Sequence, residues 1–513
     1  MFAGMSFYFL VKSGNLHRTG DNMSNEKNSA AAAKRVKFGT DGFRGVIAKE
    51  FTFEEVAIVA FAVADHIYSE KLEPLVYICY DRRFMSDIFA RHSASVFAGL
   101  GISCEISKTP VPTPALSAWM RSGRASLGIM ITASHNPYEY NGMKIKTRDG
   151  ASAPSQIVEK VQERVDGYCE AGVSATDFNG KFGVTKPGSI TDFDPIPGYL
   201  RNLRGSVDIA GISRLRSKLL INPMFGSQAG LFGRFAKENG LPLKFTEINS
   251  EHNPLFPGIN PEPIMPNLGA MAASMASKKP ADRFAAGFCY DGDGDRIAAM
   301  TSSGGFVSPQ IVYSVLLYHL AKNRGAKGAI ARTVSVTSLV SRIAAKFGLA
   351  IHETPIGFKY IADLMLDPAK NIAIGGEESG GIGISTYMPE RDGLYLSLML
   401  LEVMAFEGKD LDEIIADIYK EFGAVAYDRN DYRMSGEKFE KIRKAMNNRL
   451  PCVAGRKVVD YNGIDGHKYY LEDGSWILFR FSGTEPVLRI YAESADDAGV
   501  RSLLGFAASH LEL

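Results

Sequence analysis

Three aspartates at alternate positions carry the clearest chemical signal in the sequence. Asp291, Asp293 and Asp295 are separated by single glycines and follow an apolar run, FAAGFCY. Short carboxylates on a backbone that glycine allows to curl can converge on one hard cation. A solvated acidic turn is one alternative, and an EF-hand loop is another. The EF-hand fails because its sixth and twelfth positions should be glycine and glutamate, but are Arg296 and Ser302. Three carboxylates with an otherwise open shell favour Mg²⁺ shared with a phosphate oxygen over caged Ca²⁺.

A serine follows a second apolar run. Residues 132–137 read TASHNP and come directly after SLGIMI, which predicts that Ser134 lies at the carboxyl end of a buried strand. Open α/β sheets bind ligands at that end, although a serine there is often only a turn or cap residue. The adjacent His135 suggests a Ser-His hydrolase, but the G-x-S-x-G pattern is missing and neighbouring side chains tend to diverge. Other motifs must therefore decide whether Ser134 reacts.

Two further loops favour a phosphorylated sugar as the ligand. Residues 375–381 read GGEESGG, and their carboxylates and serine hydroxyl suit vicinal sugar hydroxyls. The nearby segments TPIGFK at 354–359 and PERDG at 389–393 add cations that could meet an anion or pair on the surface. Residues 480–486 read RFSGTEP, where backbone amides, two hydroxyls and a guanidinium could cradle a phosphate dianion. The nucleotide P-loop pattern does not occur there, so a monophosphate is expected.

Alternating strand and helix patterns must position these loops. A strand-like run at 75–80 is followed by a helical pattern at 86–99 and then by the strand before the serine loop. The alternation restarts at 218–226 and at 328–334, which predicts three similar α/β units. From about residue 427 the pattern changes to one amphipathic stretch and two β-rich pieces. We therefore expect three related α/β domains with mixed sheets and a smaller C-terminal α+β domain.

Proline and glycine suggest where these domains divide. They cluster at 186–188 and 191–198, which predicts a linker, and weaker boundaries lie near Gly304 and Gly423. The polar, alanine-rich start has no periodic apolar face, and its first ten residues lack the charged beginning of a signal peptide. The expected organisation is a disordered lead-in at 1–35, then α/β domains at 36–190, 191–303 and 304–422 that carry the serine, metal and sugar loops, and an α+β domain at 423–513 that carries the phosphate loop.

Composition excludes several classes of function. The 58 basic and 57 acidic residues nearly cancel, so the strong positive field of a nucleic-acid or anionic-membrane binder is missing. No apolar run approaches the roughly 20 residues that cross a bilayer. The five cysteines are far apart, odd in number and without C-x-x-C spacing, which indicates free thiols in a reducing compartment. We expect a cytoplasmic protein, monomeric or homodimeric, that binds neither nucleic acid nor membranes.

Taken in order, these motifs resemble those of the α-D-phosphohexomutase superfamily, which includes phosphoglucomutases and phosphomannomutases. The resemblance covers residues 38–493. It opens with FGTDGFRG at 38–45 and continues through TASHNP and NGMK at 141–144 to DGDGDR, GEESGG and RFSGTEP. It implies three α/β domains and a fourth, smaller domain around one central cleft.

The resemblance also implies a role for each matching residue. Ser134 would carry the phosphoryl group and, with Asp291, Asp293 and Asp295, hold Mg²⁺. The transferring group would be surrounded by His135, Arg44, Lys144 and Arg296. Contacts to the sugar would come from Glu377 and Ser379, with Lys359 close to the bound substrate. The phosphate that does not react would be held by Arg480, Ser482, Gly483 and Thr484.

Such a site implies a reaction in two halves. Phosphoserine gives its group to the free sugar hydroxyl, and the resulting hexose 1,6-bisphosphate turns over and returns the other phosphoryl group to Ser134. The cations and Mg²⁺ would neutralise charge during transfer. A general base is needed, and Lys144 with a depressed pKa is favoured over His135.

One position departs from part of the family. Several phosphomannomutase-type and aminosugar relatives have histidine after Ser-Gly in the sugar loop, where this chain has Gly381. The Glu-Glu-Ser form of the loop looks closer to glucose-preferring relatives, so hexose phosphate with glucose first and mannose second is expected. A phosphomannomutase, an aminosugar phosphomutase, a Mg²⁺-dependent sugar phosphatase and a sugar-phosphate-binding protein are the alternatives.

Overall fold

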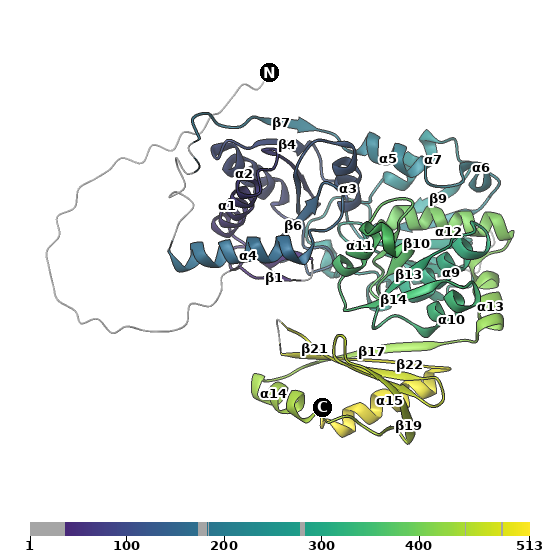
Figure 1. The fold of residues 1–513 in the computed structure, drawn as a ribbon. Helices are drawn as coiled ribbons and strands as arrows, with labels where there is room; N and C mark the ends of the chain where they lie inside the picture. Colours follow the sequence, from purple (N-terminus) through teal and green to yellow (C-terminus); the bar gives the residue numbers. More distant parts are fainter. Residues whose placement is uncertain are drawn as a thin grey trace.

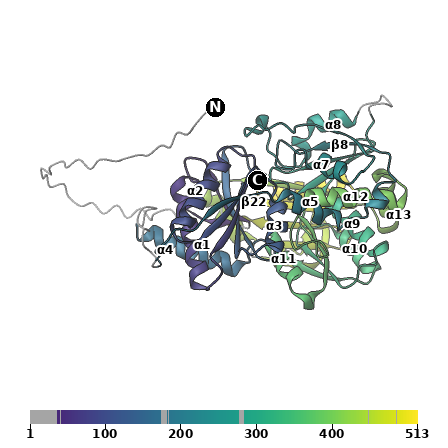
Figure 2. The ribbon, with the colours of Figure 1, turned by 90° about the horizontal axis from the view of Figure 1, so that it is seen from above.

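The computed structural model describes residues 36–39, 41–172, 182, 184–276, 283–446, 448–483 and 486–513. The predicted lead-in at 1–35 and Thr484 lie outside these residues. Four sheets follow one another along the chain, and Figures 1 and 2 show the first three assembled with their helices into one body, with the fourth sheet beside it. Mixed α/β sheets and a smaller C-terminal unit confirm the predicted fold class. Within the described residues, none of the helices combines the length and apolarity needed to cross a bilayer.

The first sheet carries the serine loop. Its strand order is β1-β2-β6-β5-β3-β4-β7, with β3, β4, β5 and β7 parallel and the strands on the β6 side antiparallel. Fully buried apolar strands such as β3 and β5 need cover on both faces, which the helices supply. The elements are β1 (Phe38–Gly39), β2 (Gly42–Val46), α1 (Phe53–Ser69), β3 (Leu75–Tyr80), α2 (Ser86–Gly99), β4 (Ser103–Ser107), α3 (Thr113–Ser122), β5 (Leu127–Ile131), β6 (Tyr140–Thr147), α4 (Ser155–Glu170) and β7 (Ile190–Phe193).

The second sheet carries the metal loop between two of its strands. Its order is β12-β11-β10-β8-β9, and β10 pairs in parallel with β8 but antiparallel with β11. Asp291 therefore begins the turn of a hairpin whose two strands are wholly buried. The elements are α5 (Ile196–Arg204), α6 (Ile209–Ile212), β8 (Lys218–Asn222), α7 (Leu231–Glu238), β9 (Lys244–Glu247), the 3₁₀ turns η2 (Phe256–Gly258) and η3 (Met265–Asn267), α8 (Gly269–Met275), β10 (Ala286–Tyr290), β11 (Ile297–Thr301) and β12 (Phe306–Val307).

The third sheet carries the sugar loop between β15 and β16. Its order is β14-β13-β15-β16, with the first three strands parallel. The long helices α9 and α12 are apolar on nearly all sides, as expected for helices that are buried against the second sheet and against neighbouring helices. The elements are α9 (Pro309–Lys322), β13 (Ala329–Thr333), α10 (Ser338–Lys346), β14 (Ala350–Thr354), α11 (Phe358–Leu366), the 3₁₀ turn η5 (Pro368–Lys370), β15 (Ile372–Gly376), β16 (Ile382–Ile384), α12 (Gly393–Glu407) and α13 (Leu411–Phe422).

The fourth sheet is antiparallel throughout and carries the phosphate loop in the turn between β21 and β22. Its order is β17-β22-β21-β20-β19-β18. One face packs on the C-terminal helix α15, and Trp476 on the other face packs against Val334 of the third sheet's domain. The elements are β17 (Ala426–Arg433), α14 (Gly436–Ala445), β18 (Cys452–Val453), β19 (Arg456–Asn462), β20 (His467–Leu471), β21 (Trp476–Phe481), β22 (Val487–Ser494) and α15 (Asp497–His510).

Two short strands fall at the predicted domain divisions. β7 begins at Ile190, inside the stretch expected as a linker, and pairs in parallel with β4 at the edge of the first sheet. The stretch 191–198 is therefore not irregular throughout, because Ile190–Phe193 form an edge strand and α5 begins at Ile196 with proline in its first turn. β12 joins the second sheet although it follows the division placed at 303. All five cysteines are free thiols.

Candidate active site

Hydrogen bonds to its backbone hold the serine loop in place. Ser134 follows β5 and has a φ of 53°, in the left-handed region that is strained for a residue with a side chain. Its N–H donates to Thr132 Oγ1 at 2.8 Å, and Thr132 Oγ1 donates to Asp81 Oδ2 at 2.6 Å. The buried Arg83 donates to the carbonyl oxygens of Ser134 at 2.6 Å and Asn136 at 2.7 Å. These bonds hold the backbone that carries the Ser134 side chain.

Asp81 and Arg83 were not predicted as site residues. They follow the buried strand β3, and their side chains lie 3.3 Å apart with no exposure. Burial raises the pKa of Asp81 more than the neighbouring Arg83 lowers it. The signal available in the sequence was that charged residues directly follow an apolar strand. The sequence could not show that Asp81 and Arg83 both hold the serine loop, which follows β5.

The predicted metal carboxylates come together next to Ser134. One ligand oxygen from each of Asp291, Asp293 and Asp295 lies within 4.8 Å of the others, and all three residues are buried. Ser134 Oγ donates to Asp291 Oδ2 at 2.8 Å, which joins the first and second domains at this point. Gly292 permits the approach, because a Cβ there would lie 2.5 Å from the Ser134 carbonyl oxygen. The hairpin turn and the serine loop are therefore in direct contact.

The carboxylate cluster has the donor set of a hard-cation site. Burial, reinforced by the charges of Asp293 and Asp295, raises the pKa of Asp291 well above its usual value. Asp293 Oδ1 and Asp295 Oδ1 are buried and have no hydrogen-bond partner among the described residues. Buried carboxylate oxygens left in this state are costly unless a cation binds them. These oxygens, Asp291 and Ser134 Oγ fit Mg²⁺.

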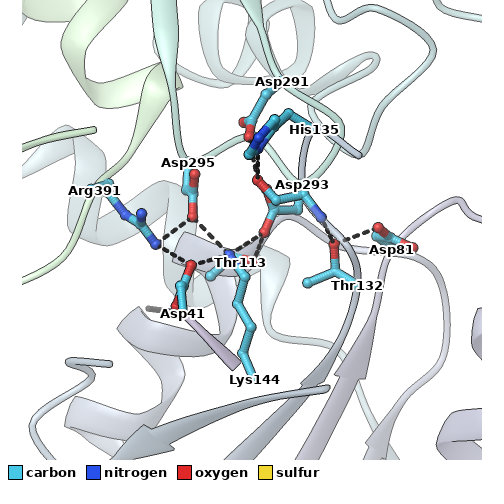
Figure 3. Close-up of polar contacts among 12 residues, drawn as sticks. Asp41, Asp81, Thr113, Thr132, His135, Lys144, Asp291, Asp293, Asp295 and Arg391 are labelled. Atoms are coloured by element: carbon cyan, nitrogen blue, oxygen red, sulfur yellow. Dashed lines mark hydrogen bonds and ion pairs between the residues drawn. The ribbon is translucent and has the colours of Figure 1, made fainter. Parts of the chain in front are cut away.

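Lys144 lies under the carboxylates and is fully buried (Figure 3). Its Nζ is 2.7 Å from Asp293 Oδ2, 3.0 Å from Asp295 Oδ2 and 2.8 Å from Asp41 Oδ2. Burial alone lowers the pKa of Lys144, but the three carboxylates outweigh burial and raise it. The depressed pKa expected of a general base is therefore wrong for this arrangement, in which Lys144 is an ammonium ion.

Arg391 is a second buried cation in the cluster, and it was not predicted as a site residue (Figure 3). Its Nη2 is 2.7 Å from Asp41 Oδ2 and 2.8 Å from Asp295 Oδ2. Its Nη1 is 3.8 Å from Glu377 Oε2, so one guanidinium connects the metal loop with the sugar loop. From the sequence, the PERDG segment is expected only to supply cations. Residues 41, 295 and 391 are far apart along the chain, so the sequence does not show that they are in contact.

His135, Arg44 and Arg296 surround the same point. His135 Nδ1 is 3.3 Å from Ser134 Oγ, and burial together with the nearby cations holds the pKa of His135 well below its usual range. Arg44 donates to Asn136 Oδ1 at 2.7 Å. The Arg296 backbone N–H donates to Asp291 Oδ1 at 3.0 Å. The structure thus brings the predicted catalytic and metal residues of two domains into one cluster.

The sugar loop lies on the third domain and faces this cluster through Glu377. Glu377 is 5% exposed, and burial raises its pKa to about 7 although Arg391 opposes the shift. A Cβ at Gly381 would lie 2.5 Å from Arg391 Cδ and 2.9 Å from Glu377 Oε2. Arg391 therefore occupies the space that a side chain at 381 would need, which explains the glycine at the position where the family pattern varies.

Lys359 and Ser379 are half-buried on neighbouring segments of the third domain. Lys359 is the second residue of α11, which packs on β15, and Ser379 follows β15 in the sugar loop. In the part of the chain that the structure describes, neither side chain contacts the metal carboxylates. Their assignment to the substrate stays a prediction.

The phosphate loop lies in the β21–β22 turn, and Arg480 at the end of β21 is already engaged. Its Nε donates to Asp465 Oδ2 at 2.9 Å, and the same oxygen accepts the Ile356 N–H of the third domain at 2.9 Å. In the loop itself, the Ser482 N–H donates to the Val487 carbonyl at 2.9 Å. Gly483 O lies 3.5 Å from Lys37 Nζ of the first domain. The first, third and fourth domains thus meet at this loop.

The four-domain fold and the serine–aspartate site define an α-D-phosphohexomutase. Domain families of phosphoglucomutases and phosphomannomutases match the chain in order: domain I at residues 35–171, domain II at 197–304, domain III at 308–422 and the C-terminal domain at 427–508. The chain belongs to the phosphoglucomutase/phosphomannomutase family.

Relatives of this family match nearly end to end. A phosphoglucomutase/phosphomannomutase of Thermococcus kodakarensis is 27% identical over 93% of this chain and 98% of its own length. A phosphoglucosamine mutase of Levilactobacillus brevis is 28% identical over 91% and 96%. The crystal structure of a Thermus thermophilus protein assigned to the phosphomannomutases is 33% identical over 93% of this chain and 99% of that one, with a TM-score of 0.80. These relatives share the fold but differ in the sugar that they are named for.

Proposed function

We propose that this chain is a Mg²⁺-dependent phosphohexomutase that interconverts hexose 1-phosphate and hexose 6-phosphate through phosphorylated Ser134. The observation that carries the proposal is the 2.8 Å contact between Ser134 Oγ and Asp291 Oδ2, because it joins the only proposed phosphoryl carrier to a buried carboxylate cluster suited to a cation. Mg²⁺ bound there would neutralise charge on the transferring phosphoryl group. The balanced charges and free cysteines support a cytoplasmic enzyme, monomeric or homodimeric.

The two halves of the reaction use the same groups of the enzyme, and the phosphoryl group moves in opposite directions. In the first half, the bond from phosphorus to Ser134 Oγ breaks as phosphorus bonds to the free sugar hydroxyl, whose proton goes to a base. The hexose 1,6-bisphosphate then turns over. The bond from its other phosphorus to the sugar oxygen breaks as that phosphorus bonds to Ser134 Oγ, and the base returns its proton to the sugar oxygen. Among the two base candidates, His135 Nδ1 lies 3.3 Å from Ser134 Oγ, whereas Lys144 Nζ lies on the carboxylates. We assign proton transfer to His135 and charge neutralisation to Lys144 on this geometry.

The remaining cations would position the two phosphates. Arg44 and Arg296 flank Ser134 and would contact the transferring group. Arg480, Ser482, Gly483 and Thr484 would hold the other phosphate, and the bond from Arg480 Nε to Asp465 Oδ2 would orient the guanidinium for a two-pronged contact. Glu377, Ser379 and Lys359 would bind the sugar from the third domain.

We propose glucose phosphate as the preferred substrate and mannose phosphate as the second. Support comes from the Glu-Glu-Ser loop and from Gly381, which Arg391 packs against, so that a histidine-type sugar contact has no place in this site. A phosphomannomutase or aminosugar phosphomutase is the alternative that the named relatives support equally.

One experiment tests both the reaction and the sugar. Purified protein is assayed with Mg²⁺ and a trace of hexose bisphosphate against the 1-phosphates of glucose, mannose, glucosamine and N-acetylglucosamine, and 6-phosphate product and inorganic phosphate are both measured. We expect 6-phosphate product, greatest with glucose, and little free phosphate. Release of inorganic phosphate in place of the 6-phosphate would identify a phosphatase, and neither product would identify a binding protein.

A further inference from the structure

A cavity lies between the first and third domains, outside the proposed active site. Its volume is about 350 Å³, which falls in the range of small-molecule sites. Two guanidinium groups, Arg121 and Arg148, line it together with Asp149, and Met365, Leu366 and Pro389 add an apolar wall. None of the residues proposed for phosphoryl transfer or sugar binding lines it. The lining has the mixture of cationic and apolar groups that suits an anion with a small organic body.

The elements around the cavity show that it lies away from Ser134. Helix α3 begins at Thr113, which donates to Asp293 at 2.6 Å, and its last turn carries Arg121. Ten residues of helix span about 15 Å, so the cavity lies roughly that far from the metal carboxylates. Helix α11 likewise begins beside Lys359 and ends at Leu366, and Figure 2 shows α3 and α11 side by side. The cavity therefore lies at the carboxyl-terminal ends of α3 and α11, whereas the amino-terminal ends of these helices lie toward the active site.

The segments that carry the two arginines pack against each other. Arg121 Nη1 donates to the carbonyl oxygen of Tyr387 in the third domain. The turn that carries Arg148 closes with a bond from the Gly150 N–H to the Thr147 carbonyl at 2.9 Å. It packs so tightly on α3 that a Cβ at Gly150 would lie 2.4 Å from Ser117 O and 3.1 Å from Arg121 Cγ. This packing, with a positive φ of 79° at Gly150, brings the turn that carries Arg148 against the helix that carries Arg121.

One exposed cation and one buried hydroxyl at the cavity are available to a ligand. Arg148, like Arg121 and Asp149, is exposed, and it makes no ion pair with any described residue. A guanidinium beside a second cation gains from binding an anion. Ser385 Oγ is buried at the same wall and has no hydrogen-bond partner within the described part of the chain. A buried hydroxyl in this state costs free energy unless a ligand or water satisfies it. Asp149 could accept a hydroxyl of the ligand's body.

We propose that this cavity is a second, distal anion site that binds a small organic phosphate ester, with the phosphate between Arg121 and Arg148 and the carbon body on the apolar wall. The occupant would contact Pro389, which directly precedes Glu390 and Arg391. Arg391 contacts Asp41 and Asp295, so the ligand would act on the segment that connects the sugar loop with the metal loop. The site exists whether or not the chain has mutase activity.

The experiment is a calorimetric titration of the full chain with inorganic phosphate and with glycerol 3-phosphate as probes. It uses an Arg480→Ala background, which removes the proposed phosphate grip of the active site. Arg148→Glu reverses one charge in the cavity, and Arg124→Glu makes the same change on an exposed residue of the neighbouring loop that does not line it. Because both changes alter net charge equally, only a site in the cavity distinguishes them.

We expect binding of both probes in the background protein, weakening on the order of tenfold or more in Arg148→Glu, and near-unchanged binding in Arg124→Glu. Circular dichroism and melting temperature check that both variants fold. Equal binding in the two charge-reversal variants, or no phosphate binding in the Arg480→Ala background, overturns the proposal. Binding of inorganic phosphate without binding of the ester would show that the cavity does not accept the carbon part of a phosphate ester.

Discussion

Ser134 combines a reactive position with a backbone that does not depend on its hydroxyl. Arg83 and Thr132 bind the main chain of the loop, whereas Ser134 Oγ bonds only to Asp291 and His135 among the described residues. Removing the hydroxyl should therefore leave the loop in place. The residue is strained at a φ of 53°, which is typical of a position retained for function.

Ser134→Ala should abolish mutase turnover while changing the melting temperature by only about 2 °C, because one hydrogen bond worth about 1 kcal/mol is lost. Intact-mass measurement should show a phosphate adduct in the parent protein and none in the variant. Ser126→Ala is the matched control, since it removes a hydroxyl that precedes β5 and donates, among the residues described, only to the Glu73 carbonyl oxygen. Turnover by the Ser134→Ala enzyme well above background, with bisphosphate present, would show that the phosphoryl carrier is another residue.

Asp293→Asn should weaken Mg²⁺ binding and lower kcat by at least about tenfold, because one anionic ligand becomes neutral at nearly constant size. Its Oδ2 already accepts bonds from Lys144 and Thr113, so Oδ1 is the atom available to the metal. Rates are measured against Mg²⁺ concentration, and against Ca²⁺, which should substitute poorly. Asp428→Asn, which changes an exposed residue of β17 in the fourth domain, serves as the control. Full activity of the parent enzyme in chelator would contradict a metal site.

Much of this cluster could be predicted from local sequence, and some of it could not. Asp291, Asp293 and Asp295 are adjacent in the chain, so their convergence follows from short-range geometry. Arg391 and Arg83 become site residues only through the packing of separate domains and loops, which no local pattern encodes. The pKa of Lys144 was predicted in the wrong direction because the number of carboxylates around a buried amine depends on the fold.

At the scale of elements, α12 connects the active site with the packing between the second and third domains. Its first turn follows Arg391. Further along, Glu402 accepts bonds from His319 of α9 at 3.0 Å, from Arg324 at 2.5 and 2.7 Å, and from the Asp208 N–H at 2.7 Å. Burial raises the pKa of Glu402, but the bonds from His319 and Arg324 outweigh it and lower the pKa to about 2.

Glu402→Gln should therefore lower the free energy of unfolding at pH 7 by about 1–3 kcal/mol. The folded pKa near 2 lies below the unfolded value of about 4.3, so the unfolded chain binds the proton first. The contribution is present above pH 4–5 and is lost as the pH falls toward 2. Urea unfolding of parent and variant at pH 7 and pH 4 should show a smaller difference at the lower pH. A difference that grows on acidification would contradict the assigned bonds.

The strand pattern explains which elements were predicted well. Buried runs such as β3, β5 and β10 are apolar throughout and were visible in the sequence. The short edge strand β7 has only one buried residue, and proline follows it, so its sequence favours a linker. It forms because β4 offers an unpaired edge, which is information from the assembled sheet.

At the scale of the whole molecule, the fourth domain is joined to the third through a few specific bonds. Asp465 Oδ2 accepts both Arg480 Nε and the Ile356 N–H, so the phosphate grip and the domain contact share one oxygen. The buried Lys468 donates to the Val334 carbonyl at 2.5 Å beside Trp476. Binding of a phosphate by Arg480 would therefore affect the contact between the third and fourth domains.

Arg480→Ala should raise KM and lower kcat in both reaction directions, because the lost charge-assisted bonds position the sugar and help to close the fourth domain. Arg480→Lys should rescue only partly, since a point charge cannot reproduce the two-pronged geometry. Because Arg480 pairs with Asp465, which is partly exposed, stability should fall by no more than about 1 kcal/mol. Asp465→Asn should raise KM without removing the cation. A much earlier melt with normal hexose phosphate binding would make Arg480 a structural residue.

The division of the hydrophobic cores predicts where the polypeptide can be cut into pieces that still fold. One continuous core runs through the second and third domains into the first, which also has a second core of its own, and the fourth domain has a separate core. A polypeptide ending at Phe422 and a second one beginning at Ala426 would divide only the small cluster in which Val334 packs against Trp476, Leu478 and Tyr491. Co-expressed as two separate chains, the pieces should fold independently and reassemble through the Trp476 contact into a working pair. A cut between the first and second domains should instead leave two insoluble halves.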